Sequence, residues 1–144
     1  MVSALTENEK RYALSKVRIE RARELVVESE RLLNEESFKS ANNRAYYAIE
    51  KSMKALLAIK GLDATTHNGV MKLINLHFIH QGDGSFSQDD YKMILRAVQI
   101  RNVSDYDDFY IASKQEAKEQ VSNARSMLQK VEIYISKMME KNDN

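Results

Sequence analysis

The chain has 144 residues, 30% of them charged, yet its formal net charge at pH 7 is only +1. Proteins that coat nucleic acid or anionic membrane carry a large positive excess, so the composition argues against both classes. Cysteine is absent, which excludes disulfides, thiolate metal sites and cysteine nucleophiles together. No apolar run approaches the roughly 20 residues of a membrane span, and residues 1–9 hold no apolar signal segment. We therefore expect a soluble, cytoplasmic protein.

Proline is absent and glycine occurs only four times. These two residues are the main helix breakers, so their scarcity favours long, uninterrupted helices. The length suits one hydrophobic core, and no repeat, low-complexity tract or domain boundary is visible. We expect a single helical domain over residues 1–144, with a core over about 6–140.

The first predicted helix spans residues 6–34, and Thr6 with Glu9 has the spacing of a capping box. Its inner stripe, at helical spacing, is predicted to hold Leu14, Val17, Ala22, Leu25, Val26, Ser29 and Leu32. A second stripe predicts a helix over 38–59, and it comprises Phe38, Ala41, Ala45, Ile49, Met53, Leu56 and Ile59. Gly61 suits the left-handed position that follows a helix.

A short third helix is predicted after Thr66, an N-cap residue, followed by a loop at 81–86. Ser87 with Asp90 opens a fourth helix, whose apolar face holds Tyr91, Ile94, Leu95 and Val98. We assign 106–112 to a linker, after which Ser113 with Glu116 opens the last helix.

The last helix has apolar residues spaced alternately four and three apart: Ala117, Val121, Ala124, Leu128, Val131, Ile135 and Met138. This alternation indicates a packing seam, against a neighbouring helix or against a second copy of the chain. Together the elements predict an all-α fold, an antiparallel bundle of four to five helices running up and down.

The fourth helix carries the main candidate site. Beyond its apolar face, the next positions in the same direction hold Arg101, Asn102 and Asp105. Burying a guanidinium and a carboxylate is costly unless they pair or meet a ligand. One interpretation is an Arg101–Asp105 ion pair, one helical turn apart, that closes the bundle. The other is a fork-shaped donor held in a cleft for a phosphate or a base.

Three further residues are candidates for the rim of that cleft. Tyr47 and Arg44 are predicted to lie away from the apolar stripe of the second helix, where they could form a contact surface or stack on a nucleotide. A tyrosine that simply lies along the surface is the alternative. His67 begins the third helix. His77 and His80 lack a carboxylate partner on their helix, so we expect no metal site and no cofactor.

Three segments together resemble the small prokaryotic HEPN domains: "NNRAYYAIEKSMKALLAIKGL" within Phe38–Leu62, "THNGV" at Thr66–Val70 and "RNVSDY" at Arg101–Tyr106. The resemblance covers roughly residues 8–136 and is greatest to the branch with an Ala-Tyr-Tyr-Ala second helix and an Arg-x-x-x-Asp-Tyr end to the fourth. It implies a helical bundle that forms homodimers, with the polar motif in a cleft at the dimer interface. It also implies a minimal nucleotidyltransferase as partner, in a toxin–antitoxin module.

The toxic branch of that family consists of metal-independent endoribonucleases, in which four to six residues separate an arginine from the histidine that follows it. The corresponding positions here hold Tyr106, Asp107 and Asp108, and no histidine follows His80. Tyrosine, with a pKa near 10, is a poor general base at pH 7. The phosphate-binding half of the motif is present, whereas its proton-transfer half is missing.

The leading hypothesis is a protein that binds nucleotide or RNA through Arg101, Asn102 and Asp105, with Arg44, Tyr47 and His67 at the rim, and that lacks standard ribonuclease catalysis. A ribonuclease with a nonstandard motif is the second, with Arg101, Asp105 and Tyr106 as the catalytic candidates. A structural scaffold is the third. The resemblance also raises the hypothesis that the partner modifies Tyr106 or Tyr110.

Overall fold

The computed structural model describes residues 4–143, and every regular element in that range is helical. The elements are α1 (Glu7–Asn34), α2 (Phe38–Ile59), α3 (His67–Ile74), the π-helical turn η1 (Asn75–His80), α4 (Gln88–Tyr106) and α5 (Lys114–Asp143). The predicted all-α fold of four to five helices is therefore confirmed. None of the helices within 4–143 combines the length and the apolar character that a membrane span requires.

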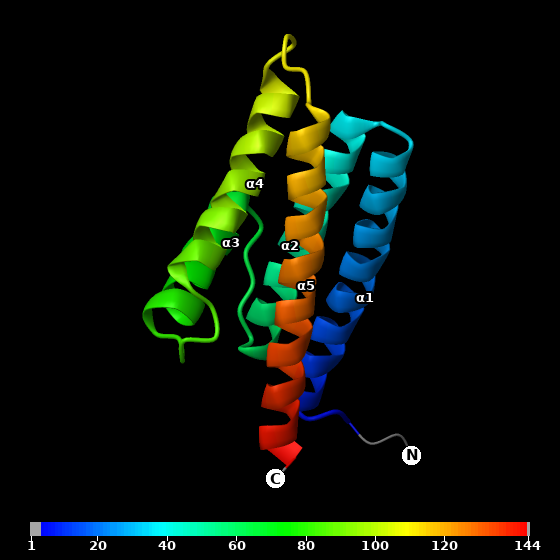
Figure 1. The fold of residues 1–144 in the computed structure, drawn as a ribbon. Helices are drawn as coiled ribbons and strands as arrows, with labels where there is room; N and C mark the ends of the chain where they lie inside the picture. The colour runs from blue at the N-terminus through cyan, green and yellow to red at the C-terminus, as the bar shows by residue number, and fades with distance from the viewer. Residues whose placement is uncertain (1–3, 144) are drawn as a thin grey trace.

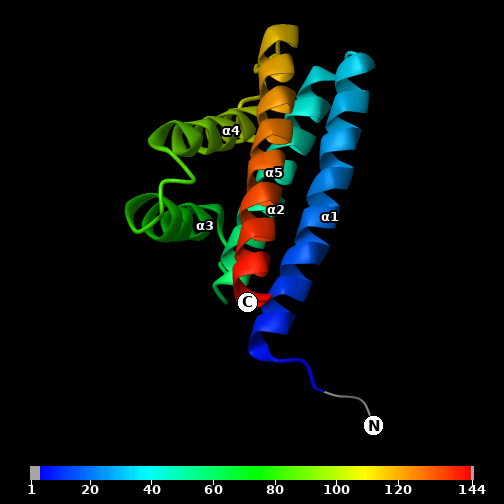
Figure 2. The same cartoon turned by 60° about the horizontal axis from the view of Figure 1, so that its bottom comes forward.

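The three longest helices, α1, α2 and α5, lie side by side (Figure 1). Successive long helices alternate in direction, as predicted, because the chain rises in α1, descends in α2, rises in α4 and descends in α5. A rotated view places α3 and α4 together on the side of the bundle away from α1 (Figure 2). As a result α1 packs on α2 and α5, while α4 packs chiefly on α2.

The core is centred on α2, the helix that contacts each of the other α-helices. Its predicted stripe is buried except for Phe38, which is partly exposed. The predicted seam of α5 is also buried, except for partly exposed Met138. Burying one large aliphatic side chain contributes about 1.5–3 kcal/mol, so these two stripes supply much of the stability. The seam of α5 packs against helices of its own chain.

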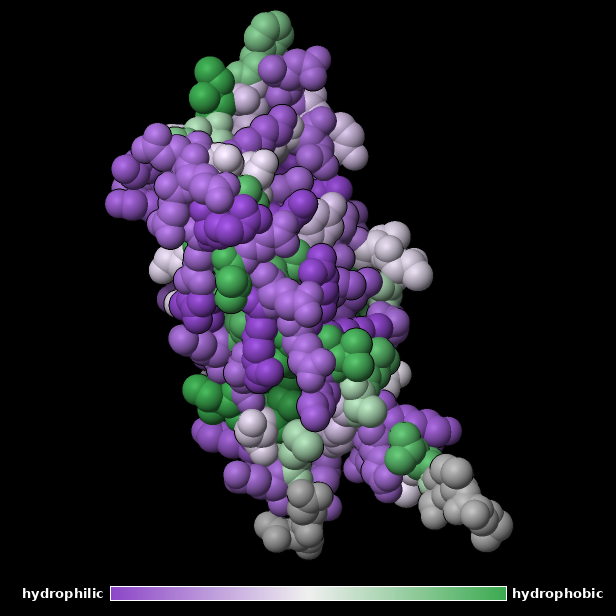
Figure 3. Space-filling model, turned by 90° about the vertical axis from the view of Figure 1, so that its right-hand side faces the viewer, coloured by the Kyte–Doolittle hydropathy of each residue, from purple (hydrophilic) through white to green (hydrophobic). Residues whose placement is uncertain are grey.

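The inner face of α1 differs from the predicted stripe. Leu14 and Val17 are 44% and 63% exposed, whereas Ser15 and Ile19 are buried. The Ser15 hydroxyl donates a hydrogen bond of 2.9 Å to the carbonyl of Ala55 on α2, so a polar residue occupies an inward position. Figure 3 views the side on which α1 lies and shows hydrophobic residues scattered within a mainly hydrophilic surface.

The predicted helix ends are formed by the expected residues. Thr6 and Thr66 each accept a hydrogen bond from an amide of the following helix, at 3.1 and 3.0 Å. Gly61 follows α2 with a φ of 70°, the left-handed conformation that glycine adopts without a steric penalty. Ser87 and Asp90 form a complete capping box at the start of α4. These ends fix where α3 and α4 begin, and so which residues face α2.

Asp90 also pairs with Lys130 of α5, which links the start of α4 to the bundle. Burial alone would raise the pKa of Asp90, but Lys130 and the amide of Ser87 outweigh it and lower the pKa below 3.8. The ionised carboxylate therefore stabilises the fold above pH 3.8, and this contribution is lost as the pH falls through the lowered folded-state pKa.

We expect Asp90→Asn to lower the free energy of unfolding by about 1 kcal/mol at pH 7, because the charged partner of Lys130 is lost. The difference from wild type should shrink below pH 3.8. Urea denaturation at several pH values measures it, with Asp89→Asn, an exposed neighbour, as the control. A difference that stays constant with pH would contradict the role assigned to the carboxylate.

Candidate functional site

Arg101 lies on the last two turns of α4, on the side that faces α2. Its side chain is only 17% exposed, and Nη2 forms the predicted ion pair with Oδ2 of Asp105 at 3.1 Å. Cζ of Arg101 lies 5.5 Å from the centroid of the Tyr46 ring, within the range of a cation–π contact. An acidic side chain and an aromatic face therefore hold the guanidinium in one place.

The surroundings of Arg101 favour its charged form. Burial by itself lowers the pKa of Arg101, but the hydrogen bond with Tyr47 and the charge of Asp105 act in the opposite direction and raise it overall. Its Nε is buried without a hydrogen-bond partner among the described residues. The result is a permanent positive charge whose position α2 and α4 fix jointly.

A second group of polar residues surrounds the hydroxyl of Tyr46, a residue that is only 3% exposed. This hydroxyl donates to Oε2 of Glu50, one turn further along α2, and also contacts Nδ1 of His67. His67 Nδ1 lies 2.6 Å from the same Glu50 oxygen. Burial and the neighbouring Glu50 raise the pKa of Tyr46, so its hydroxyl stays protonated and acts as a donor.

The Tyr46 ring joins these two groups. Arg101 lies over the ring, and the His67 ring packs edge-on against it, with the centroids 5.3 Å apart. The ring of Tyr47, the next residue of α2, also packs edge-on against the Tyr46 ring, with the two centroids 5.2 Å apart. We call Tyr46, Tyr47, Glu50, His67, Arg101 and Asp105 the polar cluster; α2, α3 and α4 all contribute to it.

The polar cluster lies at the surface and encloses almost no space. The crevice lined by Tyr46, Glu50 and His67 has a volume of about 10 Å³, room for no more than one water molecule. A more open groove of about 510 Å³ lies between α1 and α5, and it is lined by no member of the polar cluster. A ligand of the cluster would therefore lie across its exposed side, where His67 and Asp105 are 37% and 35% exposed.

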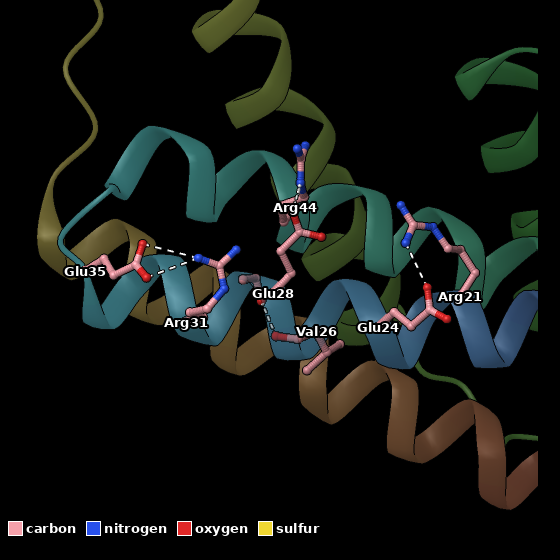
Figure 4. A network of polar contacts seen from close by, with 8 residues as sticks. Arg21, Glu24, Val26, Glu28, Arg31, Glu35 and Arg44 are labelled. Atoms are coloured by element: carbon pink, nitrogen blue, oxygen red, sulfur yellow. Dashed lines mark hydrogen bonds and ion pairs between the residues drawn. The ribbon is translucent and has the colours of Figure 1, made fainter.

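The other predicted site residues lie elsewhere. Arg44 pairs with α1 instead, because its Nε lies 2.8 Å from Oε1 of Glu28. Figure 4 shows this ion pair between α2 and α1. Asn102 is exposed, because the buried face of α4 follows Ile94, Ala97, Ile100 and Ser104 rather than the predicted line of residues. Of the predicted binding residues, the structure thus brings together Arg101, Asp105, Tyr47 and His67.

The two tyrosines that follow Arg101 differ in accessibility. Tyr106 ends α4 and is 82% exposed. The hydroxyl of Tyr110 is instead buried, without a hydrogen-bond partner in the described part of the chain. If one of the two is a modification site, Tyr106 is the one that an enzyme can reach.

Tyr46 and Glu50 were not predicted as site residues. Glu50 is the single acidic residue in the sequence of α2, and this isolated carboxylate, one turn from Tyr46, is the signal that would have found them. Among residues 4–143, no group of three or more histidines and carboxylates is placed to hold a metal ion. His77 and His80 lie on η1.

Comparison with known proteins is consistent with this arrangement of helices. Residues 15–134 match the HEPN domain family. A "UPF0332 protein" of Thermotoga maritima is 31% identical over 115 residues, which are 80% of this chain and 86% of that protein. "Putative toxin MJ0142" of Methanocaldococcus jannaschii is 32% identical over 127 residues, 88% of this chain and 85% of that protein. Two Methanocaldococcus jannaschii relatives carry the name "Putative toxin". This chain therefore belongs to the HEPN domain family.

Proposed function

We propose that this protein binds a nucleotide or an RNA segment across the polar cluster and acts with a minimal nucleotidyltransferase in a toxin–antitoxin-type module. The observation that carries the proposal is the Arg101 guanidinium, fixed between α2 and α4 by Asp105 and Tyr46. A guanidinium offers several donors in a planar fork that matches phosphate oxygens. Holding the fork in place before the ligand arrives reduces the entropy lost on binding.

The pairing of Arg101 with Asp105 shapes the expected affinity. Asp105 offsets the positive charge until a phosphate competes for the fork, so binding should be modest and salt-dependent. The near-zero net charge of the chain also predicts a modest affinity, because little nonspecific attraction to nucleic acid is expected. A ligand recognised by one fixed arginine beside aromatic rings is better described as a nucleotide or a single strand than as a long duplex.

The partner proposal rests on the family and on the names of the relatives. Two Methanocaldococcus jannaschii relatives carry the name "Putative toxin". The resemblance to the small HEPN domains implies a minimal nucleotidyltransferase as the partner in such a module. The Arg–His spacing of the standard ribonucleases is missing from α4. We therefore expect the activity of this chain to depend on binding through Arg101 rather than on that standard motif.

We also propose a homodimer, which the shape of the site supports. The crevice at the polar cluster is too small to bury a nucleotide, and a second copy placed over the exposed side would close it. Val103 near the end of α4, and Phe109 and Ile111 in the segment between α4 and α5, are exposed apolar residues that such an interface could also cover. Light scattering after size exclusion, over a range of concentrations, measures the oligomeric state; a monomer throughout would contradict the dimer.

We expect the purified chain to bind labelled single-stranded RNA with EDTA present, because recognition uses a guanidinium and no metal. Fluorescence anisotropy with RNA, ATP and duplex DNA of equal length measures it. The affinity for RNA should fall as the salt concentration rises. If neither RNA nor nucleotide binds to a folded sample at low salt, the proposed binding function is wrong.

A further inference from the structure

The groove of about 510 Å³ between α1 and α5 has an apolar floor. Ile19 and Ile135, which line it, are 6% and 8% exposed. Ser15, also a buried lining residue, donates its hydroxyl to a carbonyl of α2, so its hydrogen needs no partner from a ligand. Leu5 and Met139 line the same groove and are 51% and 45% exposed. An apolar ligand that covered these side chains would remove their surface from water.

Two polar contacts between α1 and α5 define the length of the groove. Nε of Arg23 lies 3.1 Å from Oε1 of Glu132, and both residues line the groove. Toward the chain ends, Nδ2 of Asn142 donates a hydrogen bond of 2.8 Å to the hydroxyl of Tyr12. On α1 these contacts lie about three turns, or roughly 16 Å, apart. An extended alkyl chain of about 10–12 carbon atoms matches this length.

Charged side chains flank the apolar floor and keep it narrow. Glu9, Lys16 and Arg23 line the groove from α1, and Glu132 lines it from α5. Figure 3 shows hydrophobic residues between hydrophilic ones in the half of this face that holds the chain ends. A docked helix buries an apolar stripe at least about 100° wide. A single extended chain needs only a narrow strip, so the groove suits a linear alkyl chain better than a helix.

Lys16 supplies a free positive charge at the groove. It forms no ion pair within residues 4–143, whereas the guanidinium of Arg23 is already paired with α5. The carboxylate of Glu9 would repel an anion at the other end of the groove. An anionic group would therefore lie beside Lys16, on the side toward Arg23, and an attached alkyl chain would run toward Leu5 and Met139.

We propose that this groove binds a free medium-chain fatty acid, with its carboxylate beside Lys16 and its alkyl chain on the floor between α1 and α5. The volume of the groove lies within the range of small-molecule sites. The inference is independent of the proposed RNA binding, because no residue of the polar cluster lines the groove. Binding would also stabilise the fold, since the groove requires both helices in place.

The first test is a calorimetric titration of the purified chain with hexanoate, octanoate, decanoate and dodecanoate, each below its critical micelle concentration. We expect the affinity to rise about two- to fourfold with each added CH₂, fourfold being the value for full burial. The gain should stop once the chain is longer than the groove. In NMR spectra with decanoate, the shifted amides should be those of residues 9–23 and 132–139.

A charge placed in the groove should abolish the site. Met139→Glu puts a carboxylate among the apolar lining residues, so we expect the affinity for decanoate to fall at least about tenfold. Ile133→Glu is the matched control, because Ile133 lies on the same helix, is 57% exposed and does not line the groove. It should bind decanoate as wild type does. Circular dichroism and thermal unfolding show that both variants are folded.

The role of Lys16 is tested with a charged and a neutral ligand. Lys16→Gln should weaken the binding of decanoate about three- to fivefold, as expected for an exposed ion pair. It should leave the affinity for 1-decanol unchanged, because the alcohol has no charge. Lys10→Gln, on the same helix but outside the groove, should change neither affinity.

The remaining outcomes would overturn the proposal. Equal binding to Met139→Glu and Ile133→Glu would show adsorption to the surface in general. Binding to vesicles of phosphatidylglycerol without binding to monomeric decanoate would identify a membrane contact instead. If no fatty acid binds to a folded sample and Met139→Glu alters the oligomeric state, the groove is an interface between copies of the chain.

Discussion

Arg101→Ala is expected to weaken the binding of single-stranded RNA by about 10- to 100-fold, because a charge-assisted hydrogen bond to phosphate contributes about 1.5–3 kcal/mol. The Tyr46 ring and Asp105 would remain, but Asp105 would then present an uncompensated negative charge to the phosphate. Both changes act in the same direction. Anisotropy titrations at a fixed, low salt concentration measure the loss.

Two further variants show whether position or charge causes the effect. Arg96→Ala removes a positive charge from the same helix but outside the polar cluster. The Arg96 side chain is 55% exposed, and its Nη2 lies 3.7 Å from Oε2 of Glu116. It should change the affinity less than threefold. Arg101→Lys keeps the charge but loses the planar fork, so an intermediate loss is expected. If Arg96→Ala and Arg101→Ala weaken binding equally, RNA binds through overall charge and the polar cluster is not its site.

The fold should tolerate the loss of Arg101. The carboxylate of Asp105 is 35% exposed, so water can replace its partner, and exposed ion pairs contribute about 0–1 kcal/mol. The buried Nε of Arg101 has no hydrogen-bond partner within residues 4–143, so removing it costs no hydrogen bond at that atom. Urea denaturation of Arg101→Ala should therefore show a loss of no more than about 1 kcal/mol, which separates a binding defect from unfolding.

The helices were predictable because their signals are local. The absence of proline predicts long helices. The Ser87–Asp90 capping box and Gly61 each mark a helix end within a few residues of sequence, and the structure has both ends where the sequence predicts them. The inner face of α1 was predicted less well. Its buried positions include Ser15, which donates its hydroxyl to a backbone carbonyl of α2, and a hydrophobic pattern does not mark such a residue.

The site was predictable only in part because it is assembled from three helices. Arg101 and Asp105 are one turn apart on α4, so their ion pair is visible in the sequence. The contacts among Tyr46, Glu50 and His67 depend on how α3 packs against α2, which no spacing reveals. Arg44 and Tyr47 look equivalent on a helical wheel, yet α2 lies between α1 and α4. Arg44 pairs with Glu28 of α1, whereas Tyr47 bonds to Arg101 of α4.

Leu56→Ala is expected to lower the free energy of unfolding by about 3 kcal/mol, within the 2–5 kcal/mol typical of buried leucines. Leu56 is fully buried in α2, the helix that contacts every other α-helix, so several neighbours would have to move to fill the cavity. Urea denaturation at pH 7 measures the change. The slope of the free energy of unfolding against urea concentration should equal that of wild type if the unfolded state is unaffected.

Val17→Ala on α1 is the matched control, because it shortens an apolar side chain that is 63% exposed. Its effect should stay within about 0.5 kcal/mol, since little apolar area is removed from contact and alanine favours the helix. A loss above about 1 kcal/mol that depends on protein concentration would show that this face of α1 is covered by a second copy. That result would place the dimer interface on α1, away from the polar cluster, and the cluster would then bind its ligand on an open surface.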